Sequence, residues 1–246
     1  MIIDPTAEAC DLARLPFCEA AKGRISVNQA KFTDLENVEV IVDAMPFLLS
    51  RLTAAETIQR LAARKDEPHL SDVLLPMNSA IGVAPRDNLT SARHLSEVNQ
   101  HLLLLGSWIG ESVDATAAAW LPARTILPFA EFDQLARHYL ENGLFPTSFQ
   151  TSFSKTGDGC FATLGLDYFA GQEIRMTAPP DYSPSDLRQC LAPIIDTIAT
   201  RGKINRPARS TGLNEGETLI CTPNDDLQFV DIIIQRGALD SIPPNR

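Results

Sequence analysis

The chain lacks an excess of basic residues, and this absence excludes partners that require a basic surface. It has 21 Lys and Arg against 31 Asp and Glu, which gives a formal net charge of −10 and a pI near 4.8. Nucleic-acid affinity rests on cations that neutralise phosphates, so we expect no nucleic-acid partner. An acidic balance instead favours solubility and suits a basic protein partner.

Paired cysteines and long apolar runs are also missing. The five cysteines form an odd set with no C-x-x-C spacing, so we expect reduced thiols in a cytoplasmic protein rather than a disulfide framework. No apolar segment approaches the roughly 18 residues that a membrane helix needs. The first ten residues, MIIDPTAEAC, have no basic region before an apolar run. We therefore expect neither a membrane segment nor a secretory signal.

No catalytic or cofactor motif is recognisable, so we expect no cofactor and favour a non-enzymatic protein. The stretch 157–162 (GDGCFA) formally fits the dinucleotide fingerprint. That fingerprint requires a helix after the glycines, whereas the residues here predict a strand. Ser107 in GSWIG is one residue out of register for a nucleophile elbow, which gives a serine hydrolase no support.

The middle of the chain carries the clearest local pattern and predicts three strands. Phe149 and Phe153 lie among β-tolerant residues, and 155–159 supply a turn with two glycines. The strand resumes at 160–163, which completes a hairpin. A third strand is predicted over 173–177.

Hydrophobic periodicity predicts the other elements. Thr53 and Glu56 form a capping box for one helix, and Ser183 caps another that has Pro184 at its first position. Helices are expected after Thr53 and over about 90–109, 130–142 and 183–202; strands are expected at 25–29, 38–45, 79–85, 115–120, 218–221 and 228–235.

This order predicts an α+β fold in which about four helices cover a mostly antiparallel sheet, with the option of two related α/β units. We expect an irregular segment over 1–35 and a single α+β domain over 36–240. That domain could divide into sub-units 36–125 and 126–240. Residues 241–246 are expected to form a loose tail.

Several short blocks together resemble a bacterial family. They are Ala117–Trp120, Ile126–Pro128, the pattern Thr163-x-Gly165-Leu166-x-x-Phe169, and Glu173-Ile174. These blocks resemble the bacterial domain of unknown function 4261 family over roughly residues 75–236. The resemblance implies a cytosolic bacterial domain of unassigned activity. Trp120, Gly165, Phe169 and Glu173 occupy pattern positions to which it assigns no role.

Three residues of the helix predicted over 90–109 could bind a metal ion. His94, Glu97 and His101 fall at positions i, i+3 and i+7, so their side chains could converge on one face. Two imidazoles and a carboxylate suit zinc, with a fourth position for water. The alternative, which we favour, is a solvated helix face beside an apolar stripe.

A single carboxylate, Glu173, lies on a predicted central strand. It could serve a ligand, or it could form an ion pair with a cation such as Arg175 or Arg201. We favour the ion pair, although a carboxylate with a shifted pKa is also typical of functional sites.

Basic residues gather in one short segment of this acidic chain: Arg201, Lys203, Arg206 and Arg209. Arg201 and Lys203 would complement the dipole at a helix C-terminus. Arg206 and Arg209 lie beyond the helix and could offer guanidinium groups to a carboxylate or phosphate. Lys203, Arg206 and Arg209, with Glu173, are therefore our candidate contacts for a partner or an anion.

Three functions remain open at this point. The favoured one is a non-enzymatic protein-binding module, immunity- or adaptor-like, whose partner could be a basic toxin or effector. The second is a metal-dependent or small-ligand enzyme that uses His94, Glu97 and His101 or a cleft near Glu173. The third is an oligomerisation domain whose exposed sheet edge pairs with a copy of itself.

Overall fold

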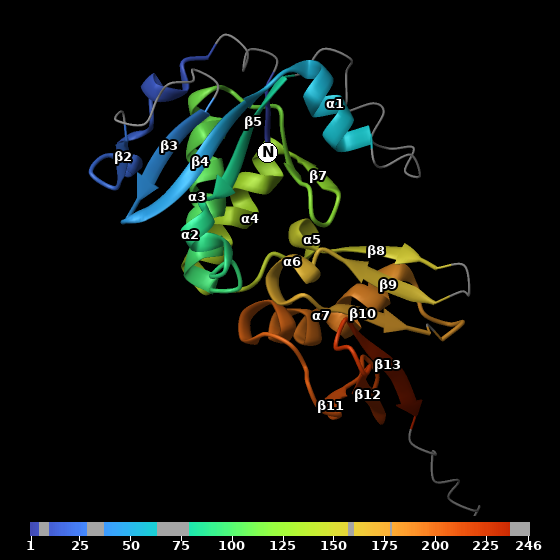
Figure 1. Cartoon of the computed structure of the whole chain (residues 1–246). Helices are drawn as coiled ribbons and strands as arrows, with labels where there is room; N and C mark the ends of the chain where they lie inside the picture. Colours follow the sequence, from blue (N-terminus) through green and yellow to red (C-terminus); the bar gives the residue numbers. More distant parts are fainter. Residues whose placement is uncertain (5–9, 29–36, 63–78, 157–159, 178, 237–246) are drawn as a thin grey trace, which may run out of the picture. The chain divides into compact units, whose positions relative to one another are not determined.

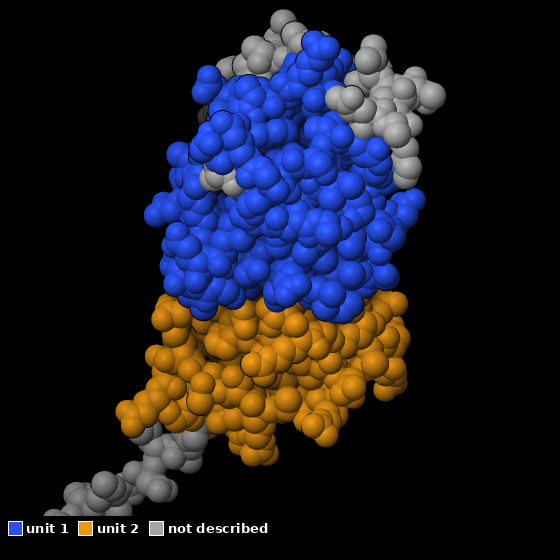
Figure 2. Space-filling view, turned by 90° about the vertical axis from the view of Figure 1, so that its left-hand side faces the viewer, with its two compact units in different colours: residues 1–152 blue, residues 153–246 orange. Residues whose placement is uncertain are grey.

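The computed structural model describes residues 1–4, 10–28, 37–62, 79–156, 160–177 and 179–236. The chain forms two compact units that divide after Ser152 (Figure 2). Each unit combines helices with a largely antiparallel sheet, which confirms the predicted α+β class. The division falls well after residue 125, where we expected a boundary between sub-units. None of the described helices has the length and apolar character needed to cross a membrane.

Unit 1 is built on a seven-stranded antiparallel sheet (Figure 1). Its strands in spatial order are β2 (Ile25–Val27), β3 (Asn37–Val42), β4 (Met45–Leu52), β5 (Ser79–Pro85), β1 (Ile2–Asp4), β6 (Ala117–Trp120) and β7 (Thr125–Pro128). β1 pairs with β5 on one side and with β6 on the other. β1 corrects the irregular segment expected over 1–35, whereas β2 lies within the strand predicted at 25–29. The strand predicted at 79–85 is confirmed.

Five helices belong to unit 1 in the described residues: α1 (Ala54–Ala62), α2 (Asp87–Thr90), α3 (Ser96–Ser112), α4 (Phe129–Asn142) and α5 (Thr147–Gln150). The capping box of α1 is confirmed, since Thr53 N–H donates to Glu56 Oε2 at 2.9 Å. α1 turns Thr57 inward, however, and leaves the apolar Ile58 42% exposed. Phe149 lies in α5 and not in the predicted strand.

The core of unit 1 centres on α3, which contacts α4, β1 and β5. Residues 102–110 of this helix are all buried, including Trp108. Gly106 and Gly110 lie on its α4 side: a Cβ on Gly110 would overlap the Phe129 ring, and one on Gly106 would lie 3.2 Å from Phe132. The GSWIG stretch therefore serves close helix packing.

Unit 2 contains a six-stranded sheet in the order β11 (Ala208–Thr211), β12 (Glu217–Pro223), β13 (Phe229–Arg236), β10 (Glu173–Met176), β9 (Phe161–Leu164) and β8 (Ser152–Lys155). The predicted β8–β9 hairpin is confirmed, and Thr156 N–H donates to the Cys160 carbonyl at 2.7 Å. The glycines 157 and 159 lie outside the described residues. A strand follows them, as the hairpin interpretation requires.

One face of this second sheet forms the core of unit 2 with α7 (Pro184–Arg201), which runs along it (Figure 1). The strand register places six buried side chains on this face: Ile174, Met176, Leu219, Cys221, Val230 and Ile232. α7 supplies the matching apolar stripe of Leu187, Leu191, Ile194, Ile195 and Ile198. Its N-terminus has the predicted cap, with Ser183 and Asp186 in a capping box and Pro184 in the first turn.

Candidate functional site

Glu173 is a buried carboxylate that three donors hold at the start of β10. Its oxygens accept from the Thr163 hydroxyl (2.6 Å), from Gly165 N–H (2.7 Å) and from Asp167 N–H (3.1 Å). The two backbone donors belong to the turn that leads into α6 (Asp167–Ala170). Burial raises the pKa of Glu173 to about 7, against the lowering effect of these hydrogen bonds.

The prediction that Glu173 forms an ion pair with a cation such as Arg175 is wrong. Arg175 binds Asp231 instead, through Nε–Oδ1 at 2.8 Å and Nη2–Oδ2 at 3.1 Å, and it stacks over the Phe229 ring. The pairing of β10 with β13 explains this difference, because Arg175 lies opposite Asp231 in the parallel register whereas Glu173 lies opposite Phe229. Glu173 therefore anchors the Gly165 turn.

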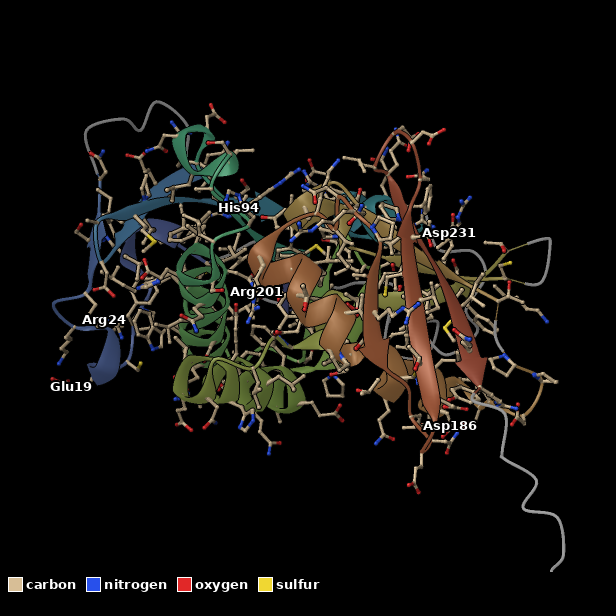
Figure 3. The ribbon with its side chains drawn as sticks, turned by 90° about the horizontal axis from the view of Figure 1, so that it is seen from below. Glu19, Arg24, His94, Asp186, Arg201 and Asp231 are labelled. Atoms are coloured by element: carbon tan, nitrogen blue, oxygen red, sulfur yellow. The ribbon has the colours of Figure 1, made fainter. Side chains whose placement is uncertain are left out.

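The three residues proposed as metal ligands do not share a helix. α3 begins at Ser96, so His94 lies in the preceding turn. Figure 3 shows His94 well apart from Arg24, which shares the partner Asp43 with His101. His101 directs Nε2 to Asp43 Oδ2 (3.0 Å) and Nδ1 to the Glu97 carbonyl (2.7 Å). Across the described ranges, no group of three or more His, Cys, Asp or Glu could hold a metal ion. The structure thus gives the metal interpretation no support.

His101 instead belongs to a polar cluster that the sequence did not reveal. Asp43 occupies the two-residue turn between β3 and β4 with φ of 46°, and it binds both Arg24 and His101. Arg24 also lies over the Trp108 ring, 5.2 Å from its centroid. The Arg24 hydrogen bond, followed by that of His101, lowers the pKa of Asp43. The cluster ties the β3–β4 turn and Arg24 to α3.

The family-pattern positions all have structural partners. Trp120 is buried and lies 6.2 Å from Phe149 between ring centroids. Gly165 adopts φ of 111°, which only glycine adopts readily, and donates to Glu173. Phe169 is buried and meets Tyr168 edge-on at 5.0 Å.

The basic segment lies on fixed backbone at one edge of unit 2. Gln172, which is fully buried, donates to the Ile204 carbonyl and accepts from Ile204 N–H. Lys203 lies against Gly171 at the end of α6, where its charge complements the helix dipole. Arg206 and Arg209 are exposed, and Arg209 belongs to β11. The sequence did not predict this strand, because three of its four residues are polar and it has no apolar alternation.

β11 is the edge strand of the second sheet, and its outer side carries unsatisfied backbone groups. Gly212 N–H donates to the Glu217 carbonyl, so Ser210 and Ala208 form the hydrogen-bonded pairs with β12. Arg209 and Thr211 therefore direct their N–H and C=O groups away from β12, toward the outer edge. Such an edge is a template for an added strand.

The sheet face next to this edge, opposite α7, exposes apolar side chains. Ile233 of β13 is 65% exposed and lies opposite Ile220 of β12, which is half-buried. Arg209 of β11 lies opposite Ile220 on the same face. We call Arg206, the β11 edge, Ile220 and Ile233 the edge site.

Glu217, the first residue of β12, joins this strand to the end of β13 and to the loop before β12. It is buried, and its carboxylate accepts from Tyr182 Oη, from Asn214 N–H (2.9 Å) and from Arg236 Nε (3.1 Å). Burial alone would raise its pKa, but these hydrogen bonds outweigh burial and lower the pKa to about 2. Gly212 has no room for a side chain there, because a Cβ would overlap Glu217.

Comparisons with known proteins add nothing to this geometry, since no protein family, curated protein or solved structure matches the chain. The resemblance to the domain of unknown function 4261 family therefore stays a prediction.

Proposed function

We propose that the chain is a non-enzymatic protein-binding module whose edge site takes an extended segment of a partner protein as an added strand beside β11. The observation that carries this proposal is the outward direction of the Arg209 and Thr211 peptide groups on an exposed edge strand. Backbone hydrogen bonds supply affinity in this mode of recognition, and alternate side chains supply specificity.

The charge of the edge site specifies an acidic segment. Arg206 and Arg209 are both exposed there, and a strand beside β11 would place every second side chain on the face that carries Arg209. Opposite charges across neighbouring strands contribute roughly 0.2–1 kcal/mol each. A partner segment with Asp or Glu at alternate positions, followed by an apolar residue that reaches Ile220, fits best.

The basic partner predicted from the net charge would need another surface. Unit 1 contains 12 Lys and Arg against 19 Asp and Glu, whereas unit 2 contains 9 against 12, so most of the acid excess lies in unit 1. An adaptor-like protein, which binds an acidic segment through unit 2 and a basic partner through unit 1, accommodates both predictions. An immunity-like role with a basic toxin would use unit 1 alone.

Self-association through the same edge is the less favourable alternative. A symmetric antiparallel pair of β11 strands would bring together the cationic residues of two copies. Like charges on directly opposed strands are destabilising. A sizing measurement that gives a dimer, abolished by Thr211→Pro, would favour oligomerisation over partner binding.

The proposal is tested by selecting 12-residue peptides from a random displayed library against the full chain. We expect the selected peptides to alternate Asp or Glu with other residues. Thr211→Pro removes one outward N–H without touching the β12 pairing, and Arg209→Glu reverses the charge; each should weaken binding of a selected peptide at least ten-fold.

Arg188→Glu is the matched control, because Arg188 is an exposed cation on α7 rather than at the edge. It should leave peptide affinity within about two-fold. Peptides that lack acidic alternation, or that bind Thr211→Pro and Arg209→Glu as tightly as the unmodified chain, would refute strand addition at β11.

A further inference from the structure

A cleft of about 450 Å³ opens on the outer face of the unit 1 sheet, away from α3. Its lining comes from β3, the β3–β4 turn, the start of β4 and the beginning of α2: Glu39, Ile41, Ala44, Pro46, Arg86, Asp87 and Asn88. This volume lies within the range of roughly 300–1,000 Å³ that is typical of small-molecule sites.

Arg86 is held in a defined position on one wall of the cleft. Its backbone N–H donates to the Pro46 carbonyl at 3.1 Å. Its Nε meets Oε2 of Glu39 at 3.0 Å, and Glu39 Oε1 accepts from Asn28 Nδ2 at 2.8 Å. Because Glu39 contacts Nε, the Nη1–Nη2 edge of the guanidinium points away from Glu39. A second carboxylate can bind this edge in a bidentate manner.

The next residue brings the opposite charge to the same wall. Asp87 follows Arg86 directly, lines the cleft and is exposed. Asp87 is thus a second carboxylate of the cleft, beside the Arg86–Glu39 ion pair. Ile41, Ala44 and Pro46 form an apolar surface beside this pair of charges. The cleft is thus lined by one guanidinium, two carboxylates and an apolar surface.

We propose that this cleft binds a free α-amino acid with an apolar side chain. The α-carboxylate would meet the Nη edge of Arg86, the α-ammonium would meet Asp87, and the side chain would lie on Ile41 and Pro46. The two charged groups of an α-amino acid are attached to one carbon, and this arrangement matches charges supplied by consecutive residues. The site lies in unit 1 and does not depend on the strand-binding function proposed for unit 2.

Titration calorimetry with L-leucine against the full chain tests the proposal. N-acetyl-leucine removes the ammonium and leucinamide removes the carboxylate, so each should bind at least ten-fold more weakly than leucine. Asp87→Asn should also weaken leucine binding at least ten-fold. Because Asp87 is exposed, this variant should keep its fold, which circular dichroism verifies.

Glu141→Gln is the control for the loss of one negative charge, since Glu141 is an exposed residue of α4 in the same unit. It should bind leucine as the unmodified chain does. The proposal fails if leucine gives no heat of binding at concentrations up to about 10 mM, where even a weak complex would form. It also fails if either derivative binds equally well, or if Asp87→Asn and Glu141→Gln behave alike.

Discussion

The side-chain amide of Gln172 forms a two-way hydrogen bond with the backbone of Ile204: Nε2 donates to the carbonyl at 3.1 Å, and Oε1 accepts from N–H at 2.9 Å. The same Nε2 also lies 3.3 Å from the Leu227 carbonyl. One buried side chain therefore joins the start of β10 to two other segments. One of these segments leads directly to Arg206 and β11, so Gln172 positions the edge site.

Gln172→Ala should destabilise unit 2, because it leaves part-buried backbone groups of Ile204 and Leu227 without the Gln172 side chain as a partner. Each such group costs about 1–3 kcal/mol, so we expect a loss of roughly 2–4 kcal/mol. Hydrogen exchange of β10 and β13 amides measures this loss within unit 2. Gln189→Ala, at an exposed position of α7, should change stability by less than about 0.5 kcal/mol. Equal effects of the two substitutions would contradict the role given to Gln172.

Glu173 should make unit 2 less stable as the pH rises. Burial raises its pKa from 4.5 to about 7 in the folded chain. Between these values the folded chain binds more protons than the unfolded chain, so the free energy of unfolding falls as the pH increases. The expected loss is about 3 kcal/mol by pH 8.

Glu173→Gln cannot ionise and should remove this loss. The free energy of unfolding of the variant and of the unmodified chain is compared at pH 5 and pH 8, from hydrogen exchange of the β10 amides in urea. A difference between the two pH values that is the same in the variant and the unmodified chain would show that Glu173 is not the titrating group.

Glu217 should have the opposite effect at acid pH. Its pKa of about 2 lies below the ordinary value of 4.5, so its contribution is present above pH 4.5 and is lost as the pH falls toward 2. Tyr182→Phe removes one donor, so acid unfolding of unit 2 should begin at a higher pH, with a loss of about 1 kcal/mol at neutral pH. Glu215→Gln, in the exposed loop nearby, is the control and should leave the acid transition in place. An unshifted transition in Tyr182→Phe would contradict this account.

The packing of α3 on α4 predicts a destabilising glycine substitution. A Cβ at Gly110 would overlap Phe129, so Gly110→Ala should cost about 1–3 kcal/mol through overpacking. Adding Phe129→Ala should recover part of this cost, which a double-mutant cycle measures. Fluorescence of Trp108 and Trp120, both in unit 1, reports the unfolding. Gly82→Ala serves as the control, because a Cβ on Gly82 would have only ordinary contacts at 3.5 Å. If the effects of Gly110→Ala and Phe129→Ala are additive, the steric explanation is refuted.

Elements with local signals were predictable from the sequence. Ser183, Pro184 and Asp186 define the start of α7 through the capping box, and the turn at 155–159 defines the β8–β9 hairpin. Elements that depend on distant partners were missed. β1 has three residues and is a strand only because β5 and β6 flank it, and β11 is polar and pairs on one side only.

The candidate site shows the same limit. Arg206 and Arg209 could be selected from the sequence, because basic residues gather there in an acidic chain. Ile233 could not, because it lies in the continuous apolar run 232–234 and only the strand register shows which residues face α7. The strand predicted over 38–45 covers β3 and the turn after it, whereas β4, which contains Pro46, was not predicted. The Pro46 carbonyl accepts from Arg86 N–H, which no local pattern shows. The two backbone donors to Glu173 come from a turn that no local pattern specifies.

The central claim, strand addition at β11, is tested most directly by amide hydrogen exchange at Arg209 and Thr211, measured by nuclear magnetic resonance with and without a bound acidic peptide. Both N–H groups point outward in the free chain, so we predict fast exchange there and strong protection in the complex, while Ser210, already paired with β12, changes little. Fast exchange at Arg209 and Thr211 while the peptide is bound would contradict the account.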